Sequence, residues 1–530
     1  MIDFSAEEIA RETAAQLVVS SQDICFSECV IDSRRASKGC IFVAFKGETQ
    51  NGNVFAESAL AKGAAGVVLS EEPSAALLAC ARTQHAFVLR AEHDDCEEFL
   101  LRLAHAKRQK HPEYIVIAVT GSCGKTTTKD MLLSVMSSHF KSFATPGNYN
   151  NLIGLPLTLL MAPQDVEVII CEMGMNHLHE LDRMSLCARP NLAIITNIGT
   201  SHIGLLGSRE NIARAKSEVL KGLVAPLDAS FEPCLLLSQD DDFTPFIIKH
   251  FALPNGITTR LVGLGNASSE SVSSAASDSS DSSAPSAASD PSDSSDSSDS
   301  SAYASPLVHA ANIHVEDIAF DAHACPSCTY VYAAGAREPL HLPHPGETSV
   351  LDSLFALELA EILHVPRKKA LSALAHMPVV HMRLEEIKRP HTPLIINDSY
   401  NASPSSIAGA LAVLQEIDCR GRRIAVLGEV GELGDQAHLL HGYIGSFVAG
   451  QALDLIVFIG DAYAEDMYRA YCIMGGTSAR VLRYQDVAEA ITEFPNHISE
   501  DDCVLIKASR AAQLDLLVDH IMSTGDTKQC

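Results

Sequence analysis

The chain has 530 residues, 47% of them hydrophobic, which is enough for several domains with cores of their own. Its formal net charge of −27 argues against a nucleic-acid partner held on a basic surface. There is no run of about 18 uncharged apolar residues, so no transmembrane helix is expected. The 15 cysteines lack the spacing of a disulfide framework, and the acidic N-terminus does not resemble a signal peptide, so we expect a cytoplasmic protein.

Residues 1–95 are predicted to form a small α/β domain. Strands are expected at 41–45 and 66–69, with a helix at 55–62 that ends at a glycine. Small and polar residues in loops that follow strands are where ligands bind in α/β sheets. By themselves these residues are better explained as ordinary turns; they are Asp32, Ser33, Arg34, Lys46 and Asn51.

A second domain, residues 96–380, is expected to open with a helix at 97–108 and continue with the sequence IVIAVTGSCGKTTT at 115–128. A buried strand, a glycine-rich turn and a helix place backbone N–H groups around a phosphate. The turn and first helical residues are Gly121, Ser122, Cys123, Gly124, Lys125, Thr126 and Thr127. Lys125 would reach the outer phosphates and the Thr126 hydroxyl a Mg²⁺ ion. Val119 stands where the longer P-loop pattern has a glycine, so the loop is short at its front, and we predict nucleoside triphosphate binding.

Two further side chains follow strands of the same predicted sheet. Glu172 comes at the end of a strand at 166–171, and His202 comes after a strand at 192–196. A carboxylate at the carboxyl end of a strand beside a phosphate loop is suited to Mg²⁺, so both are expected to share the crevice of Lys125. Lys216, on a helix at 210–221, would by itself be read as a solvated charge. Asn148, Asn150 and Asn151 either line a polar pocket or form turns.

The rest of the second domain contains a compositionally biased insertion. Residues 266–306 are almost entirely Ser, Ala and Asp without Lys or Arg, which predicts a disordered segment. A Ca²⁺ role for its aspartates is disfavoured because the glycine-based turn of a Ca²⁺ loop is missing. Cys325 and Cys328 are expected to be reduced thiols, since no second CxxC pair lies nearby. A strongly amphipathic helix at 351–363 and another helix at 367–375 are predicted to end this domain.

Residues 381–530 are predicted to form a third, Rossmann-like α/β domain. Strands at 393–397, 423–427, 454–459 and 502–506 alternate with helices, which indicates a second doubly wound sheet. Polar clusters again follow the strands, at the edge where such sheets bind ligands. These clusters contain Asp398, Tyr400 and Asn401, then Glu432 and Leu433, while Arg383 stands at the start of the domain.

The motifs, taken in order, resemble the Mur ligase family over nearly the whole chain apart from the insertion. The matching stretches are DSRR, FVAFKGETQNGN, TGSCGKTTTK, TPGNYNNLIGLP, EMGMNH, NIGTSHIGLLGS, IARAKSEVL, DSYNASP and LGEVGELG. The resemblance implies an N-terminal domain for a UDP-sugar peptide, a central mostly parallel P-loop-type domain for ATP, and a C-terminal domain that closes over both.

DSYNASP and LGEVGELG resemble the members that add D-alanyl-D-alanine. The implied enzyme is an ATP-dependent ligase that joins D-Ala-D-Ala to UDP-N-acetylmuramoyl-tripeptide in peptidoglycan precursor synthesis. An acyl phosphate is the intermediate, and UDP-N-acetylmuramoyl-pentapeptide, ADP and phosphate are the products. Bringing a carboxylate to a phosphate requires cations, here Lys125 and two Mg²⁺ ions.

The resemblance also implies roles for individual residues. Thr126 would hold the first Mg²⁺, Glu172 and His202 the second, and Lys216 matches a lysine that is carbamylated in many of these ligases. Arg383, Asp398, Tyr400 and Asn401 would contact the nucleotide. Glu432 and Leu433 would border the D-Ala-D-Ala site, and Ser33, Arg34, Lys46 and Asn51 the UDP side.

The chain departs from the family pattern most clearly in one stretch, with milder changes at Ala508 and Glu429, and several alternatives stay open. Residues 346–352 lack the His and the first Asn of a Gly-x-His-Asn-x-x-Asn sequence near the adenine, and Asp352 stands at the last position. The alternatives are a sister ligase that adds one amino acid, a folylpolyglutamate-type ligase, and a non-catalytic protein that binds cell-wall precursors. The third residue of the tripeptide, diaminopimelate or lysine, stays open, and we expect a monomer.

Overall fold

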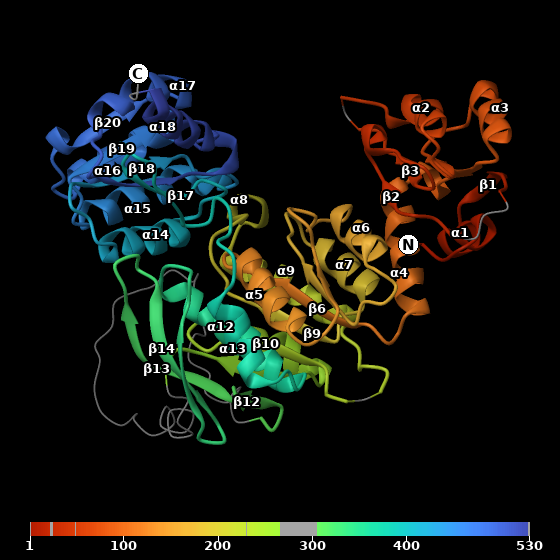
Figure 1. Ribbon diagram of the computed structural model, residues 1–530, viewed down its shortest axis with the longest axis horizontal. Helices are drawn as coiled ribbons and strands as arrows, with labels where there is room; N and C mark the ends of the chain where they lie inside the picture. The colour runs from red at the N-terminus through yellow and green to blue at the C-terminus, as the bar shows by residue number, and fades with distance from the viewer. Residues whose placement is uncertain (1, 22–24, 48, 229, 266–304, 528–530) are drawn as a thin grey trace, which may run out of the picture.

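The computed structural model describes residues 2–21, 25–47, 49–228, 230–265 and 305–527. It contains three α/β bodies, each built around a mainly parallel sheet (Figure 1). The predicted Ser/Asp-rich insertion at 266–306 lies almost wholly outside the described residues. Within the described ranges, no helix combines the length and apolarity needed to cross a membrane.

The N-terminal sheet has five strands in the order β1-β5-β4-β3-β2. Strands β2 to β5 run parallel, and β1 pairs antiparallel with β5. The strands are β1 (Gln16–Val19), β2 (Cys29–Val30), β3 (Ile41–Ala44), β4 (Gly66–Leu69) and β5 (Phe87–Arg90), and the helices are α1 (Ala6–Thr13), α2 (Ala56–Ala61) and α3 (Ala75–Gln84). Strands β3 and β4 confirm the predicted strands in this region.

Helix α4 (Cys96–Lys110) connects the first body to the second. Asp95 caps it by accepting the Glu98 N–H at 2.9 Å, and Phe99, Leu100 and Leu103 are buried along it. It packs against α6 and α7 of the central body and also against α1 of the N-terminal body. This helix therefore fixes where the N-terminal body attaches (Figure 1).

The central sheet has seven strands, all parallel, in the order β12-β11-β10-β9-β6-β8-β7. Parallel sheets are covered on both faces, and the inner strands at 115–120, 168–172, 192–195 and 234–238 are accordingly almost continuous apolar runs. The strands of the sheet are β6 (Ile115–Thr120), β7 (Ser142–Ala144), β8 (Val168–Glu172), β9 (Leu192–Ile195), β10 (Cys234–Ser238), β11 (Thr258–Val262) and β12 (Val308–Ala310). All their carboxyl ends meet at one edge, where the predicted P-loop lies.

Helices cover both faces of this sheet, and a three-stranded antiparallel sheet follows it. The helices are α5 (Lys125–Ser137), α6 (Gly154–Met161), α7 (Glu180–Ala188), α8 (Ile203–Leu206), α9 (Arg209–Ser217), α10 (Thr244–Ile247), α12 (Glu347–Ile362) and α13 (Arg367–Ala375). The small sheet contains β13 (Ile313–Phe320), β14 (Pro326–Tyr332) and β15 (Arg337–His341). The helix predicted at 210–221 ends earlier, because α9 passes into a 3₁₀ turn at Glu218–Gly222.

The prediction that the helix at 351–363 is strongly amphipathic was wrong. Helix α12 is packed between α5, α13 and strands β11, β13 and β14, so its sides are almost all covered. Polar residues are buried in it together with the apolar ones, among them Asp352, Ser353 and Glu358. A helix surrounded by other elements has no solvent face for its polar residues.

The C-terminal sheet has six strands in the order β16-β17-β21-β18-β19-β20, parallel except for β16 at its edge. The strands are β16 (Glu385–Ile387), β17 (Leu394–Asp398), β18 (Arg423–Gly428), β19 (Leu455–Ile459), β20 (Val481–Tyr484) and β21 (Cys503–Lys507). The helices are α14 (Pro404–Glu416), α15 (Ala437–Ala449), α16 (Ala462–Ile473), α17 (Val487–Glu493) and α18 (Asp515–Thr527). The predicted doubly wound sheet is confirmed.

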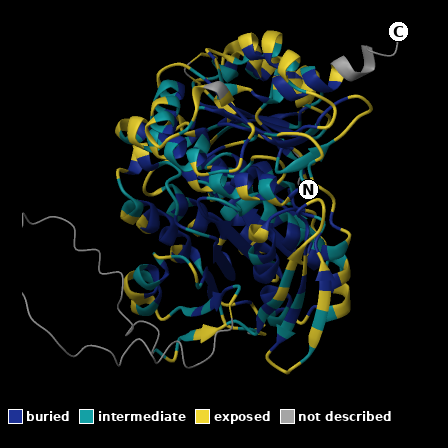
Figure 2. Cartoon of the chain, turned by 90° about the vertical axis from the view of Figure 1, so that its left-hand side faces the viewer, coloured by how far each residue is buried: buried dark blue, intermediate teal, exposed yellow. Residues whose placement is uncertain are grey.

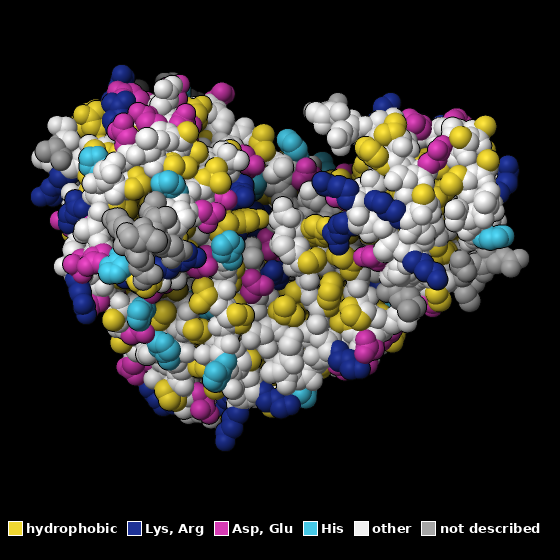
Figure 3. Space-filling view, turned by 45° about the horizontal axis from the view of Figure 1, so that its top comes forward, with side chains coloured by type: hydrophobic (Ala, Val, Ile, Leu, Met, Phe, Trp, Pro, Cys, Tyr) yellow, Lys and Arg dark blue, Asp and Glu magenta, His cyan; other side chains and the backbone are white. Residues whose placement is uncertain are grey.

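Buried residues lie in the sheets and along the helix sides that face them, and exposed residues lie on the outer helices (Figure 2). The C-terminal and central bodies are in direct contact, whereas the N-terminal body stands to one side (Figure 1). The space-filling view shows a notch between the two upper lobes (Figure 3). The candidate site is made of residues from these bodies.

Candidate active site

The turn between β6 and α5 is held in the shape of a phosphate-binding loop. Gly121 has φ +150°, and a Cβ there would lie 1.8 Å from Thr196 Oγ1. The Ser122 N–H donates to the Asn197 carbonyl at 3.0 Å, and the Cys123 N–H donates to Asn197 Oδ1 at 2.9 Å. Asn197, which follows β9, therefore fixes the turn from the neighbouring strand. Asn197 opens the stretch NIGTSHIGLLGS, and no role was predicted for it from the sequence.

Lys125 folds back over this loop. Its Nζ donates to the Gly121 carbonyl at 2.8 Å and to the Ser122 carbonyl at 3.4 Å. Burial lowers the pKa of Lys125, and the negative charge of Glu172 acts in the opposite direction. Glu172 is thus close enough to interact electrostatically with the Lys125 ammonium group.

Glu172 is the last residue of β8 and is 2% exposed. Its Oε1 accepts a hydrogen bond from Asn150 Nδ2 at 2.8 Å, and its backbone N–H donates to Thr145 Oγ1 at 2.9 Å. Oε2 has no hydrogen-bond partner within the described part of the chain, although it is buried. A buried carboxylate oxygen without a donor fits a cation, so this position could hold a metal ion. Asn150, which the sequence left as pocket or turn, orients that carboxylate.

His202 precedes helix α8 and has the left-handed backbone φ of +64°. Its Nδ1 lies 2.5 Å from Glu432 Oε2, which comes from the C-terminal body. The contact with His202 is the main cause that lowers the pKa of Glu432, and the charge of Lys125 acts in the same direction. The structure therefore pairs a predicted metal residue with a predicted substrate residue.

Lys216 is 1% exposed at the end of α9. Among the described residues, its Nζ has no hydrogen-bond or ion-pair partner. Burial lowers the pKa of Lys216 well below its ordinary value, and repulsion from Lys125 adds to this shift. Burial and the Lys125 charge therefore both favour the neutral amine over the ammonium form at this position.

The C-terminal body reaches the phosphate loop through several side chains. Arg383 NH2 donates to Thr126 Oγ1 at 3.4 Å, and the guanidinium lies 4.3 Å from the centroid of the Tyr400 ring. Cys123 Sγ lies 3.3 Å from Ser403 Oγ. The sequence had not singled out Ser403 as a site residue.

Asp398 and Asn401 are held by a buried lysine that the predicted site did not include. Lys507 ends β21, next to β17, and is 2% exposed. Its Nζ lies 2.5 Å from Asp398 Oδ2 and donates to the Asn401 carbonyl at 3.0 Å. Only the strand order brings Lys507 beside Asp398, because the two residues are far apart in the chain.

Asp352 lies beneath the phosphate loop. Its Oδ1 accepts a hydrogen bond from Thr128 Oγ1 at 2.8 Å, and a Cβ on Gly124 would come within 2.9 Å of the same oxygen. Burial raises the pKa of Asp352 to about 7, against the lowering effect of the Thr128 bond. Asp352 therefore supports the loop from helix α12.

The four predicted residues of the N-terminal body lie on surface turns of that body. The Ser33 carbonyl accepts from Lys62 Nζ at 2.7 Å, and Arg34 pairs with Asp32 at 2.7 Å. Lys46 forms an isolated bridge with Asn51, whose Nδ2 donates to Glu71 Oε2 at 3.2 Å. Within the described ranges, no hydrogen bond or ion pair joins these four to the phosphate loop.

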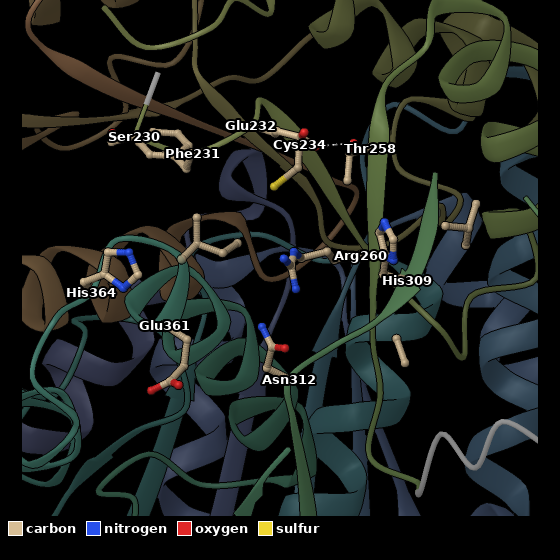
Figure 4. A pocket seen from close by; sticks show the side chains of 13 residues that line it. Ser230, Phe231, Glu232, Cys234, Thr258, Arg260, His309, Asn312, Glu361 and His364 are labelled. Atoms are coloured by element: carbon tan, nitrogen blue, oxygen red, sulfur yellow. Dashed lines mark hydrogen bonds between the residues drawn. The ribbon is translucent and has the colours of Figure 1, made fainter. Parts of the chain in front are cut away.

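The described chain also contains a cavity and a cluster of potential metal ligands. A cavity of about 770 Å³ around Arg260 is lined by the first residues of β10, β11 and β12, Cys234, Thr258 and Val308 (Figure 4). It therefore opens at the sheet edge opposite the phosphate loop. His179, Asp182 and Glu218 place potential ligand atoms within 4.8 Å of one another, but Lys221 already occupies Asp182 Oδ2 at 2.9 Å.

Comparison with known proteins assigns all three bodies to one family. Its models match residues 26–108 as "Mur ligase family, catalytic domain", 119–288 as "Mur ligase middle domain" and 382–510 as "Mur ligase, glutamate ligase domain". UDP-N-acetylmuramoyl-tripeptide–D-alanyl-D-alanine ligase of Bacillus subtilis (strain 168) is 29% identical, over 93% of this chain and 92% of its own length. The Escherichia coli (strain K12) protein of the same name is 26% identical, over 95% of each chain.

Solved structures give the same result. MurF from Acinetobacter baumannii is 25% identical and has a TM-score of 0.78, covering 98% of this chain and 99% of that one. MurF from Thermotoga maritima in complex with ADP is 21% identical, covers 94% of this chain and 98% of its own, and with a TM-score of 0.70 shares the fold. Matched along three successive segments and over nearly its full length, the chain belongs to the Mur ligase family.

Proposed function

We propose that this chain is an ATP-dependent ligase that joins D-alanyl-D-alanine to UDP-N-acetylmuramoyl-tripeptide. The relatives in Bacillus subtilis and Escherichia coli carry that name and align over nearly the whole chain. The observation that carries the proposal is the convergence of Lys125, Glu172 and Lys216 beside a phosphate loop to which the C-terminal body is docked. The predicted domain limits 1–95, 96–380 and 381–530, the monomeric state and the cytoplasmic location are part of the same proposal.

The loop binds the triphosphate and the C-terminal body holds the rest of the nucleotide. Backbone N–H groups at the start of α5 and the Lys125 ammonium group stabilise the phosphate charges. Arg383, which contacts Thr126 and stacks on Tyr400, would contact the phosphates. Lys507 holds Asp398 and Asn401 in place. The carboxylate of the tripeptide can then attack the γ-phosphate in line, and ADP leaves.

The second half of the reaction is amide formation. The amine of D-Ala-D-Ala attacks the acyl carbon, and the tetrahedral intermediate expels phosphate and loses a proton. Glu432 and Leu433 would border the dipeptide, since their loop reaches His202. Ser33, Arg34, Lys46 and Asn51 would contact the UDP side, and Figure 3 shows basic side chains on the right-hand lobe near the notch.

The residues present also fit Mg²⁺. Glu172 Oε2 is buried without a hydrogen-bond donor in the described chain, and Thr126 carries a hydroxyl at the loop. We assign Thr126 to one Mg²⁺, and Glu172, His202 and a modified Lys216 to a second. When bound, Mg²⁺ neutralises charge on the phosphate oxygens as the carboxylate approaches.

Modification of Lys216 is supported by its burial. A neutral amine can attack CO₂: an N–C bond forms, a proton is released, and the side chain becomes a carbamate anion. The neutral state that this attack needs is the one that burial favours for Lys216. A carbamate would also remove the repulsion between Lys216 and Lys125, which both carry a cation when protonated.

The proposal is tested by measuring phosphate release from ATP with purified protein. We expect release only when UDP-N-acetylmuramoyl-tripeptide and D-Ala-D-Ala are both present, and mass spectrometry should show the pentapeptide product. Tripeptides ending in diaminopimelate or lysine should be supplied separately, since this comparison identifies the third residue. Lys125→Met should abolish release, while Lys141→Met, on an exposed lysine paired with Asp165, should not.

Each alternative has its own outcome in this assay. Release with a single amino acid in place of the dipeptide would indicate a sister ligase, and release with glutamate and a folate would indicate a folylpolyglutamate-type ligase. Binding of the UDP-tripeptide without phosphate release under any combination would indicate a non-catalytic precursor-binding protein.

A further inference from the structure

Residues 429–436 form a loop, the 429–436 loop, that connects the C-terminal sheet to the central body. The Glu432 carbonyl accepts the Gly204 N–H at 3.0 Å, and Glu432 Oε2 lies 2.5 Å from His202 Nδ1. Leu433 is buried, and a Cβ on Gly204 would lie 2.2 Å from Gly434 N. The loop thus carries the residues proposed to border the dipeptide into contact with α8.

Two residues of this loop have left-handed backbone conformations, and for the non-glycine residue this costs free energy. Glu432 has φ +62°, a left-handed value that non-glycine residues adopt at a cost, and Gly434 has φ +53°. Such a conformation persists only where surrounding contacts fix it. The contacts that do so must come from outside the loop.

One such contact holds the start of the loop from β21. The Glu429 carbonyl accepts two hydrogen bonds from Ser509, one from its backbone N–H at 3.1 Å and one from its hydroxyl at 2.7 Å. Ser509 follows the last strand of the C-terminal sheet. This fixes the carbonyl side of the Glu429–Val430 peptide group and leaves its N–H side, that of Val430, to be held by another residue.

The second contact comes from His441, which is fully buried in α15. Its Nε2 accepts the Val430 N–H at 2.9 Å, and its Nδ1 lies 2.7 Å from the Ala437 carbonyl. Both bonds form only when the proton is on Nδ1 and the lone pair on Nε2. The Tyr463 ring stacks on the imidazole at 4.7 Å and an interplanar angle of 6°, which fixes its plane.

We propose that His441, as the neutral Nδ1-protonated tautomer, is a positioning residue that holds the 429–436 loop in the geometry needed for dipeptide binding. The imidazole touches no proposed substrate or metal group and acts through the Val430 peptide. A second proton would sit on Nε2, opposite the Val430 N–H, and the two donors would repel. This inference rests on the proposed ligase function, because it assigns His441 to the dipeptide side of that site.

The surroundings of His441 favour its neutral form. Burial lowers the pKa of His441, while the Ala437 carbonyl and the charges of Glu429, on the loop, and Asp466, on α16, act in the opposite direction. His438, one turn earlier on α15, lowers it further. We therefore expect the loop to be held at neutral pH and released only in acid.

Two isosteric substitutions separate the two nitrogens. Gln places an oxygen near the position of Nε2 and can accept the Val430 N–H, whereas Asn replaces Nδ1 and leaves that N–H without an acceptor. For His441→Asn we expect the KM for D-Ala-D-Ala to rise about tenfold or more, with the KM for ATP unchanged. His441→Gln should lie closer to wild type and should weaken the rise in this KM that wild type shows in acid.

The matched control is His438→Gln, an exposed histidine on the same helix that pairs with Asp466. It should leave the KM values for ATP and for D-Ala-D-Ala unchanged. Equal KM values for wild type, His441→Asn and His441→Gln would overturn the proposal, and so would a rise in the ATP KM that matches the rise for the dipeptide.

The tautomer itself can be observed without any turnover. In protein labelled with ¹⁵N at histidine, His441 is assigned as the resonance missing in His441→Gln. Its shifts should show protonated Nδ1 and unprotonated Nε2 at neutral pH, and an Nε2-protonated tautomer would refute the inference. If wild type showed no dipeptide-dependent phosphate release, the ligase function would fail while the tautomer result would still stand or fall separately.

Discussion

A buried lysine that has no partner among the described residues and a buried aspartate beneath the loop are the two residues that most constrain the chemistry. Burial disfavours the charged ammonium form of Lys216, and it also disfavours the charged carboxylate form of Asp352. Proteins keep such groups where the reaction needs them or where a bound ligand compensates. Each of these two residues leads to a testable prediction.

Lys216→Arg should lower kcat/KM for the ligase reaction roughly 100-fold or more, because arginine stays charged and cannot form a carbamate. Wild type depleted of CO₂ should lose activity and recover it when bicarbonate is added. Lys221→Arg, on an exposed lysine of the same segment paired with Asp182, is the control. A ¹³C-bicarbonate label should give a carbamate NMR signal in wild type only, and full activity of Lys216→Arg would refute the assignment.

Asp352 makes the stability of the ligand-free protein pH-dependent. Its pKa rises from 3.8 to about 7 on folding, so between these values the folded chain holds a proton that the unfolded chain has lost. The free energy of unfolding therefore falls as pH rises through this window, by at most about 4 kcal/mol for this group. Asp352→Asn should remove that part of the pH dependence and raise the melting temperature at pH 8 relative to wild type.

The control for Asp352→Asn is the same change at the exposed residue Asp317. Melting temperatures of the three proteins would be measured by scanning calorimetry from pH 4 to pH 8. A wild-type curve that Asp352→Asn merely shifts in parallel would contradict the assignment of this pH dependence to Asp352.

At the scale of elements, the β6–α5 turn depends on space that only glycine leaves. Gly121 has both a positive φ and a would-be Cβ that collides with Thr196. Gly121→Ala should raise the Kd for ATP roughly 10–100-fold, since the turn must move away from Thr196 to fit the methyl group. Isothermal titration calorimetry with a non-hydrolysable ATP analogue measures this directly.

Gly409→Ala is the matched glycine control, because a Cβ there meets open space and its helix α14 favours alanine. It should leave nucleotide affinity unchanged and stabilise the protein by up to about 1 kcal/mol. Unchanged affinity in Gly121→Ala would mean that the turn does not bind the phosphates in this conformation.

At the scale of the whole molecule, the C-terminal body is docked on the phosphate loop while the N-terminal body is attached through α4. Cys123 meets Ser403, Thr126 meets Arg383, and His202 meets Glu432. The insertion lies between β11 and β12, far along the chain from each of these contacts. It is almost entirely Ser, Ala and Asp, a composition that offers little apolar surface for packing against the sheets.

Deletion of Ser269 to Ala302 should therefore leave kcat and all KM values within about twofold of wild type, an effect no larger than that of a typical surface change. Steady-state phosphate release with both substrates is the measurement, and circular dichroism confirms that the shortened chain is folded. A large fall in kcat with intact folding would show that the insertion takes part in the reaction.

Local sequence patterns predicted many of the strands and helices and most residues of the phosphate loop. Apolar runs that end in glycine or polar clusters are local patterns, so β6, β8, β9, β17 and β18 and their ligand-binding ends could be read directly. Glu172 and Lys125 were found for that reason. His202 was placed in the crevice for the same reason, whereas the role of Lys216 came from the resemblance, and whether either residue binds metal stays a prediction.

The contacts between residues from distant segments became known only from the folded structure. Lys507 holds Asp398 because β21 pairs with β17, and Asp352 supports Thr128 because α12 packs on α5. Burial of Lys216 and the pairing of His202 with Glu432 depend likewise on packing between elements and bodies. Sheet order and interdomain packing are set by contacts across the whole chain, which a local pattern of residues does not encode.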